Sequence, residues 1–231
     1  AVHASYLNAE FKVGTSKITF TENQLHRIVL EYGEAIMHIQ FIYNSYLKNT
    51  PWDIDFELDL SKPGKVLTPQ EHYLIGNELQ RNGIKLSSIC LDPLKDAEAV
   101  NDNLQLHCEI ADTFGYRLSF KNADISMNDT AAAMKYLKGK VHFKMNNILW
   151  MSAIELAKAL DADLFGKLCA ACGCEATADA ADRALVLGYR KALNPKEEGN
   201  VAADMKAFLE AHHAEYAAAI KENVAAKLKN I

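Results

Sequence analysis

The feature that most constrains the fold is a helix-like stretch that ends in Gly and is followed almost at once by a short strand-like run. This arrangement occurs three times, at Gly83, Gly115 and Gly139. Glycine just past a helix adopts the left-handed conformation at no steric cost, and such loops are typical of helix-to-strand connections in α/β proteins. We therefore predict strands that alternate with helices and pair in parallel.

The predicted helix starts agree with this pattern. Capping boxes at residues 21–24 and 68–71 each mark a helix start, and Pro69 suits the first helical position of the second. The helix after Thr21 is expected to bury one side, which is formed by Leu25, Ile28, Val29, Ile36, Ile39 and Leu47. The tail at 201–229 is rich in Ala, Glu and Lys and predicts one long helix.

Candidate strands begin near residues 54, 84, 116 and 141, with a fifth at 184–189. Alternate side chains point to opposite faces of a strand. On the first, third and fourth of these strands one face is apolar and the other is polar. The polar faces carry Asp55, Glu57, Asp59, Arg117, Ser119, Lys121, His142, Lys144 and Asn146.

This polarity favours a barrel over an open sheet. Strands of an open parallel sheet are covered by helices on both faces and are apolar on both. In a (β/α) barrel, the apolar face would meet the surrounding helices and the polar face would point inward. Such barrels place their chemistry at the carboxyl ends of the strands.

The strand count is too low for a closed barrel. Eight repeats usually need about 250 residues, whereas this chain has 231, and the residues before Thr21 offer only one or two more short strands. We therefore predict one TIM-barrel-like α/β domain over residues 1–231, a partial barrel of about five parallel strands that lacks its amino-terminal repeats. Residues 195–231 are expected to form its carboxyl-terminal helical segment.

Composition excludes several functions and partners. The net charge of -5 argues against nucleic acid, which is bound through basic surfaces. No apolar run approaches the roughly 20 residues needed to span a bilayer, and no secretory signal is visible at the start. Five cysteines, an odd number, do not suggest a secreted disulfide framework. The expected location is the cytoplasm.

Two groups of residues are possible metal ligands, but each is better explained as ordinary residues of a helix. Cys169, Cys172 and Cys174 could share a soft metal ion, but no partner pair lies nearby in sequence and the stretch is typical of a packed helix. His212 and His213 are expected to be ordinary residues of a helix face. We assign no metal-ligating residue.

Several stretches resemble the tagaturonate/fructuronate epimerase family, a metal-dependent family of sugar-acid epimerases. The stretches are 18–25, 32–36, 68–72, 141–144 with Trp150, and 210–216. The resemblance implies the carboxyl-terminal part of such an enzyme, an isomerase of carbohydrate metabolism, with a small hexuronate or ketouronate as substrate. Because family members are longer at the amino end, a missing segment or a homo-oligomer is expected to complete the barrel.

This chain departs from the family at two positions that the resemblance implies are metal ligands. Lys121 stands where the family has a His, and Gly188–Tyr189 lacks the His that precedes the family's Tyr-Gly. A protonated lysine has no lone pair to offer a metal. A divalent metal ion is therefore only a possible cofactor, and the family's mode of binding it is not expected here.

Epimerisation beside a carbonyl needs a base, an acid and a cation that stabilises the enediolate. The candidate catalytic residues are Glu57, Asp59, Lys121 and His142. The carboxylate of either Glu57 or Asp59 could be the base. The candidate substrate-binding residues are Asn122, Lys144 and Asn146, and a basic pair suits a uronate carboxylate. The alternative is a non-catalytic relative, in which these charges neutralise each other and the chain binds an anionic sugar or an assembly partner.

Overall fold

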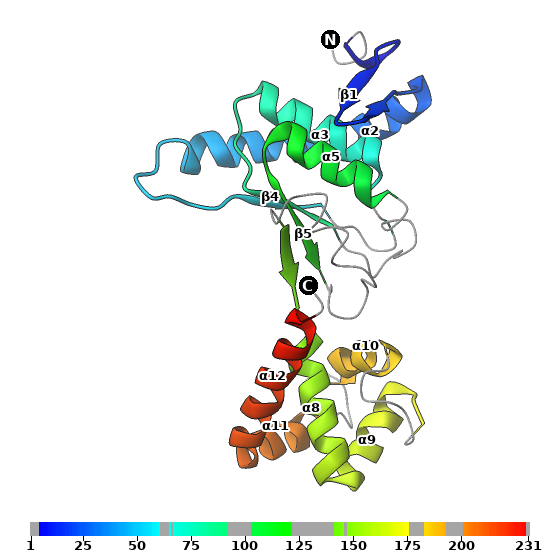
Figure 1. The fold of residues 1–231 in the computed structure, drawn as a ribbon, viewed down its shortest axis with the longest axis vertical. Helices are drawn as coiled ribbons and strands as arrows, with labels where there is room; N and C mark the ends of the chain where they lie inside the picture. The colour runs from blue at the N-terminus through cyan, green and yellow to red at the C-terminus, as the bar shows by residue number, and fades with distance from the viewer. Residues whose placement is uncertain are drawn as a thin grey trace. The chain divides into compact units, whose positions relative to one another are not determined.

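The computed structural model describes residues 5–60, 65, 67–91, 103–121, 141–145, 147–175, 183–192 and 201–229. In these ranges the elements, labelled in Figure 1 where there is room, are β1 (Phe11–Val13), β2 (Ser16–Ile18), α2 (Glu22–Ile42), the π-helix η1 (Tyr43–Leu47), β3 (Glu57–Asp59), α3 (Pro69–Arg81), β4 (Ser88–Leu91), α5 (Leu104–Phe114), β5 (Arg117–Lys121), β6 (Val141–Lys144), α8 (Asn147–Leu160), α9 (Ala162–Cys172), α10 (Arg183–Ala192), α11 (Ala202–Ala211) and α12 (His213–Leu228). None of the helices in these ranges is both long enough and apolar enough to cross a membrane.

The chain divides into two compact units. The first comprises residues 1–121 and 127–144, and the second comprises residues 122–126 and 145–231. The prediction of one barrel-type domain over residues 1–231, with a helical segment from residue 195, stays a prediction.

The first unit contains a parallel four-stranded sheet in the order β3-β4-β5-β6. All three strand pairings are parallel, and helices follow β3 and β4 in the chain. The predicted alternation of strands and helices is therefore confirmed as a mixed α/β fold with a parallel sheet.

Both predicted helix starts are confirmed. Thr21 and Thr68 each accept a hydrogen bond from the backbone N–H of the third helical residue, and that residue's side chain accepts one from the backbone N–H of the threonine. In the second box, Glu71 Oε2 accepts from Thr68 N at 2.8 Å, while its other oxygen accepts from Lys65 Nζ at 2.6 Å. Glu71 is fully buried, so these bonds provide the partners that a buried carboxylate requires.

Gly83 and Gly115 follow helices α3 and α5 as the sequence predicts, with φ of 71° and 76°. Only glycine adopts this left-handed backbone without strain, and it lets the chain turn from each helix toward β4 and β5. Gly139, the third such position, lies outside the described residues.

The apolar face of the sheet forms the core of the first unit. Leu58, Ile89, Leu118 and Phe120 are buried, and the sheet lies beneath α3 and α5, which pack on each other (Figure 1). On α2, the predicted stripe is buried at Leu25, Ile28, Ile36 and Ile39. Val29 differs, because it is 38% exposed at the edge of the stripe.

The strands are shorter than predicted. Residues 54–56 and 84–87 precede β3 and β4 without being part of them. Before Thr21 the chain forms an antiparallel hairpin of β1 and β2, which is a separate two-stranded sheet. The hairpin therefore adds no strand to the parallel sheet.

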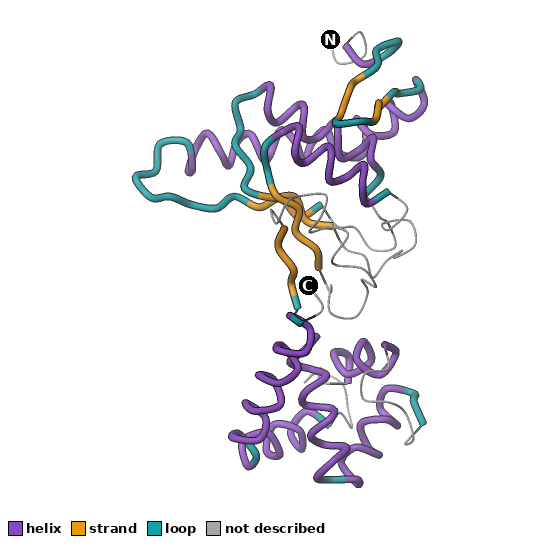
Figure 2. Tube along the Cα trace, in the orientation of Figure 1, coloured by secondary structure: helices purple, strands orange, loops and turns teal. Residues whose placement is uncertain are grey.

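The predicted fifth strand at 184–189 is wrong, because these residues lie in helix α10 (Figure 2). Leu185, Val186, Tyr189 and Ala192 are buried, and this spacing has the period of a helix. A short apolar run cannot be assigned by pattern alone. Gly188 fits helix packing, since a Cβ there would lie 2.9 Å from Cys172 Cβ on α9.

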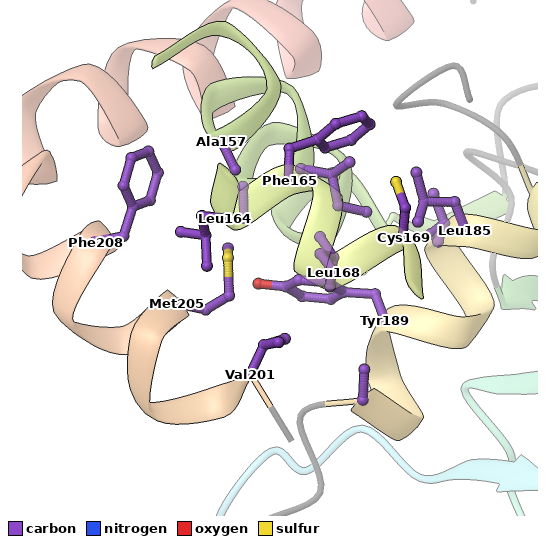
Figure 3. Close-up of a cluster of buried hydrophobic side chains, with 14 of the residues drawn as sticks. Ala157, Leu164, Phe165, Leu168, Cys169, Leu185, Tyr189, Val201, Met205 and Phe208 are labelled. Carbon is purple, nitrogen blue, oxygen red and sulfur yellow. The ribbon is translucent and has the colours of Figure 1, made fainter. Parts of the chain in front are cut away.

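The tail forms two helices, so the prediction of one long helix is wrong. The break is at His212, whose φ of -113° and ψ of 35° are not helical. Neither Gly nor Pro signals it in the sequence. In the second unit, Met205 and Phe208 of α11 pack with α8, α9 and α10 around one apolar cluster (Figure 3).

The cysteine-rich segment is a packed helix, as predicted. Cys169 is buried in α9 and Cys172 is its last residue, and all five cysteines are free thiols. Burial raises the pKa of Cys169, and it raises that of Cys172 to about 11. Neutral thiols of this kind are poor metal ligands.

Two histidines are buried in contact between α3 and α5. His72 Nδ1 and His107 Nδ1 are 2.9 Å apart, and His72 Nε2 is 2.8 Å from the Tyr116 hydroxyl. Only one of the two facing nitrogens can carry a proton, and burial favours the neutral form of both rings. Burial lowers the pKa of His107 to about 4, and it lowers that of His72 well below its ordinary value.

We predict that this pair makes the protein less stable in acid. Between pH 6.5 and the lowered pKa values, the unfolded chain binds more protons than the folded chain. The free energy of unfolding should therefore fall as the pH falls from 7 to 5, with a slope approaching about 1.4 kcal/mol per pH unit for each histidine. Urea unfolding at several pH values measures this slope. His107→Gln should reduce it and the exposed control His26→Gln should not; equal slopes in all three proteins would contradict the assignment.

Candidate active site on the polar face of the sheet

Strand register places the polar side chains on one face of the sheet. Glu57 is level with Ser88 and Arg117, and Asp59 is level with Cys90, Ser119 and His142. Lys121 is level with Lys144. Residues in register across parallel strands point to the same side. We call this surface the polar face, formed by Glu57, Asp59, Ser88, Cys90, Arg117, Ser119, Lys121, His142 and Lys144.

Two ion pairs cross the polar face. Lys144 on β6 pairs with Glu57 on β3, and Lys121 on β5 pairs with Asp59 on β3. Each of the four side chains is between 27% and 33% exposed. The structure thus brings together four of the residues that the sequence predicted for the site.

These pairs require a curved sheet. Glu57 and Lys144 lie on the two edge strands, three strand spacings or roughly 14 Å apart, and four residues or about 13 Å apart along the strands. Extended Glu and Lys side chains could not meet over that distance on a flat sheet. Because they do meet, the sheet curves with its polar face on the concave side.

The Lys144–Glu57 pair holds both groups in their charged forms. Burial alone would raise the pKa of Glu57, but hydrogen bonds from Lys144 and Ser88 lower it below its ordinary value. Burial alone would lower the pKa of Lys144, but the hydrogen bond to Glu57 raises it. Ser88 Oγ donates to Glu57 Oε2 at 2.9 Å. A carboxylate held in this way is a weak base until its cationic partner moves away.

Cys90 lies under the two ion pairs. The residue is 2% exposed, and its thiol sulfur is 3.8 Å from Lys144 Nζ. Burial and the carboxylate of Asp59 raise the pKa of the thiol to about 11, so it stays neutral at physiological pH. Cys90 is therefore packing beneath the charges and adds none of its own.

His142 has a different partner from the other predicted catalytic residues. Its Nε2 is 3.1 Å from Arg117 Nη1, and Arg can only donate. Nε2 must accept this bond, so a neutral His142 carries its proton on Nδ1. The imidazole is exposed and lies level with Asp59 at the opposite edge of the sheet.

Two members of the polar face, Ser88 and Cys90, were not among the predicted site residues. They alternate along β4 with the larger apolar residues Ile89 and Leu91, and all four are buried. This alternation in the predicted second strand was the available signal. The predicted substrate-binding residues Asn122 and Asn146 lie outside the described residues.

The polar face does not fit a divalent metal ion. Among the residues that the structure describes, no group of three or more His, Cys, Asp and Glu side chains could hold one. Each carboxylate of the polar face already faces an ammonium group, whose charge opposes a second cation. The side chains that could act on a substrate here are therefore the carboxylates, the lysines and His142.

The four-stranded parallel sheet, with its paired charged side chains on one face, defines a mixed α/β fold. The family model of tagaturonate epimerase matches residues 1–215. The chain therefore belongs to the tagaturonate epimerase family, as the resemblance implied.

Alignments with individual proteins agree with this family assignment. The tagaturonate/fructuronate epimerase of Thermotoga maritima is 25% identical over 174 residues, which cover 71% of this chain and 36% of that protein. The native structure of a fructuronate-tagaturonate epimerase from Cohnella laeviribosi aligns with a TM-score of 0.80 and 22% identity, over 99% of this chain and 56% of that one. Its complex with two glycerol molecules aligns with a TM-score of 0.81 and 21% identity. This chain thus spans about half the length of the solved relatives, and these alignments establish its fold.

We predict that the Lys144–Glu57 pair contributes more to stability than an exposed pair does. A double-mutant cycle of Lys144→Met and Glu57→Gln should give a coupling energy of about 1 kcal/mol, because the pair is partly shielded from water. The matched control is the Lys17–Glu10 pair of the hairpin, whose side chains are 64% and 61% exposed. Its coupling should be below about 0.5 kcal/mol. Equal couplings would show that the pair across the sheet is not shielded.

Proposed function

We propose that this chain forms part of a sugar-acid epimerase, which interconverts small hexuronates by removing a proton beside a carbonyl. Family membership over residues 1–215 supports the reaction class. The observation that carries the proposal for this site is the pair of Lys–carboxylate contacts on the concave polar face. An anionic sugar and these carboxylates would compete for the same lysines.

This competition suggests how the base becomes available. When the carboxylate of the substrate binds Lys121, Asp59 loses its cationic partner, so the positive charge that opposed protonation of its carboxylate is gone. Asp59, or Glu57 by the same exchange with Lys144, then removes the proton. A lysine of the polar face that lies beside the reacting carbonyl stabilises the negative charge of the enediolate. His142, with a proton on Nδ1, is the proposed acid that returns a proton, and the proton taken by the carboxylate is then passed back to the exposed His142 through solvent, so that both groups are restored.

The proposed architecture is a partial TIM-barrel. A curved parallel sheet with a polar inner side and helices on its outer side supports this arrangement. Both edge strands, β3 and β6, have one side without a strand neighbour in the described sheet. A further segment of the family's fold, or a second copy of the chain, is the proposed partner that would extend the sheet.

A divalent metal ion stays a prediction, and no step above depends on one. We propose a cytoplasmic location, which five free thiols support, because thiols persist in reducing compartments.

The decisive assay is interconversion of tagaturonate and fructuronate. Asp59→Asn and Lys121→Met should each lower kcat/KM by about a hundredfold or more, because they remove the base and the carboxylate anchor. Lys17→Met, which removes an exposed ion pair of the hairpin, is the matched control and should leave the rate unchanged. Wild-type rates in both polar-face variants would remove these residues from the site.

A second candidate function is favoured by the same ion pairs, which can also neutralise each other permanently. In that case the chain binds an anionic sugar, or an assembly partner, without turning the sugar over. Calorimetry with tagaturonate separates the two functions: a non-catalytic protein would bind it, lose binding in Lys121→Met, and show no turnover.

A further inference from the structure

The second unit contains a pocket that the proposed reaction does not use. It has a volume of about 440 Å³ and lies among helices α8, α10, α11 and α12. This volume is within the usual range for small-molecule sites. The lining residues are Trp150, Tyr189, Ala202, Met205, Lys206, Leu209, Glu210, His213 and Tyr216.

The inner walls of the pocket are aromatic and fixed in place. The rings of Trp150 and Tyr189 are 5.5 Å apart and tilted by 52°, so they form a corner. The Tyr216 hydroxyl donates to Leu149 O at 3.0 Å, which anchors the third ring. Flat apolar compounds pack well on walls of this kind.

One polar group at the pocket, the Tyr189 hydroxyl, is buried without a hydrogen-bond partner among the described residues. Tyr189 is 0% exposed, and its hydroxyl has no hydrogen-bond partner among the described residues. Buried hydroxyls are normally hydrogen-bonded. Figure 3 shows the hydroxyl pointing toward Met205, which also lines the pocket. Methionine has three rotatable bonds and adapts to its neighbours, so a turn of this side chain would open the hydroxyl to the pocket.

The mouth of the pocket is charged. Lys206 Nζ and Glu210 Oε1 are 3.9 Å apart, and their side chains are 77% and 69% exposed. His213 is also exposed at this rim. A loosely held, solvated lysine can exchange its partner for the carboxylate of a ligand.

We propose that this pocket binds a planar aromatic acid that carries a hydroxyl at the end opposite its carboxylate. The rings of Trp150, Tyr189 and Tyr216 hold the aromatic part. The ligand hydroxyl pairs with the Tyr189 hydroxyl, and the carboxylate faces Lys206 at the mouth. The site is separate from the polar face and does not depend on the proposed epimerase activity.

Fluorescence titration with 6-hydroxy-2-naphthoate tests this inference, with 2-naphthoate as the matched compound that lacks the hydroxyl. The hydroxy compound should bind saturably, one molecule per chain, about fivefold more tightly than 2-naphthoate, because only it can pair with Tyr189. Tyr189→Phe should abolish this difference, and Lys206→Met should weaken both compounds. Lys17→Met is the control and should change neither.

Three results would overturn the inference. These are the absence of saturable binding, a preference for the hydroxy compound that persists in Tyr189→Phe, and wild-type affinity for both compounds in Lys206→Met. Thermal unfolding tests its premise separately. Tyr189→Phe should not lower the Tm, because the hydroxyl it removes has no partner in the described structure. A lower Tm would show that the hydroxyl is already used within the fold.

Discussion

The ion pairs that cross the sheet determine how the candidate site is built. A lysine on β6 reaches a glutamate on β3, and this contact is possible only on a curved sheet whose charged face is concave. The same curvature keeps the four charged groups about one third exposed or less. Their pairing offsets the cost of partial burial, while residual solvent contact leaves them open to exchange with an anionic ligand.

The sequence predicted the parallel sheet and much of its polar face because both follow from local rules. Capping residues located α2 and α3, and alternation along the strands separated Glu57, Asp59 and Lys121 from their apolar neighbours. It failed at residues 184–189, where the apolar run suits either a strand or a buried helix, and the structure shows a helix packed against α9. It also failed at His212, where the helix breaks without a Gly or Pro in the sequence.

Pairing between side chains was not predictable from the sequence. Alternation shows which residues share a face, but the partner of each lysine depends on register and on curvature, which are properties of the assembled sheet. His142 illustrates this limit, because its contact with Arg117 sets its tautomer and could not be inferred from its position in the strand. Lys121 is a further case, because only the assembled sheet shows that it pairs with Asp59.

A crystal structure with a bound hexuronate would test the central claim most directly. In that structure the carboxylate of the sugar should lie within hydrogen-bond distance of Lys121 or Lys144, and the corresponding Asp59 or Glu57 should have lost its lysine. A hexuronate bound elsewhere, with both ion pairs intact, would contradict the assignment of the site to the polar face.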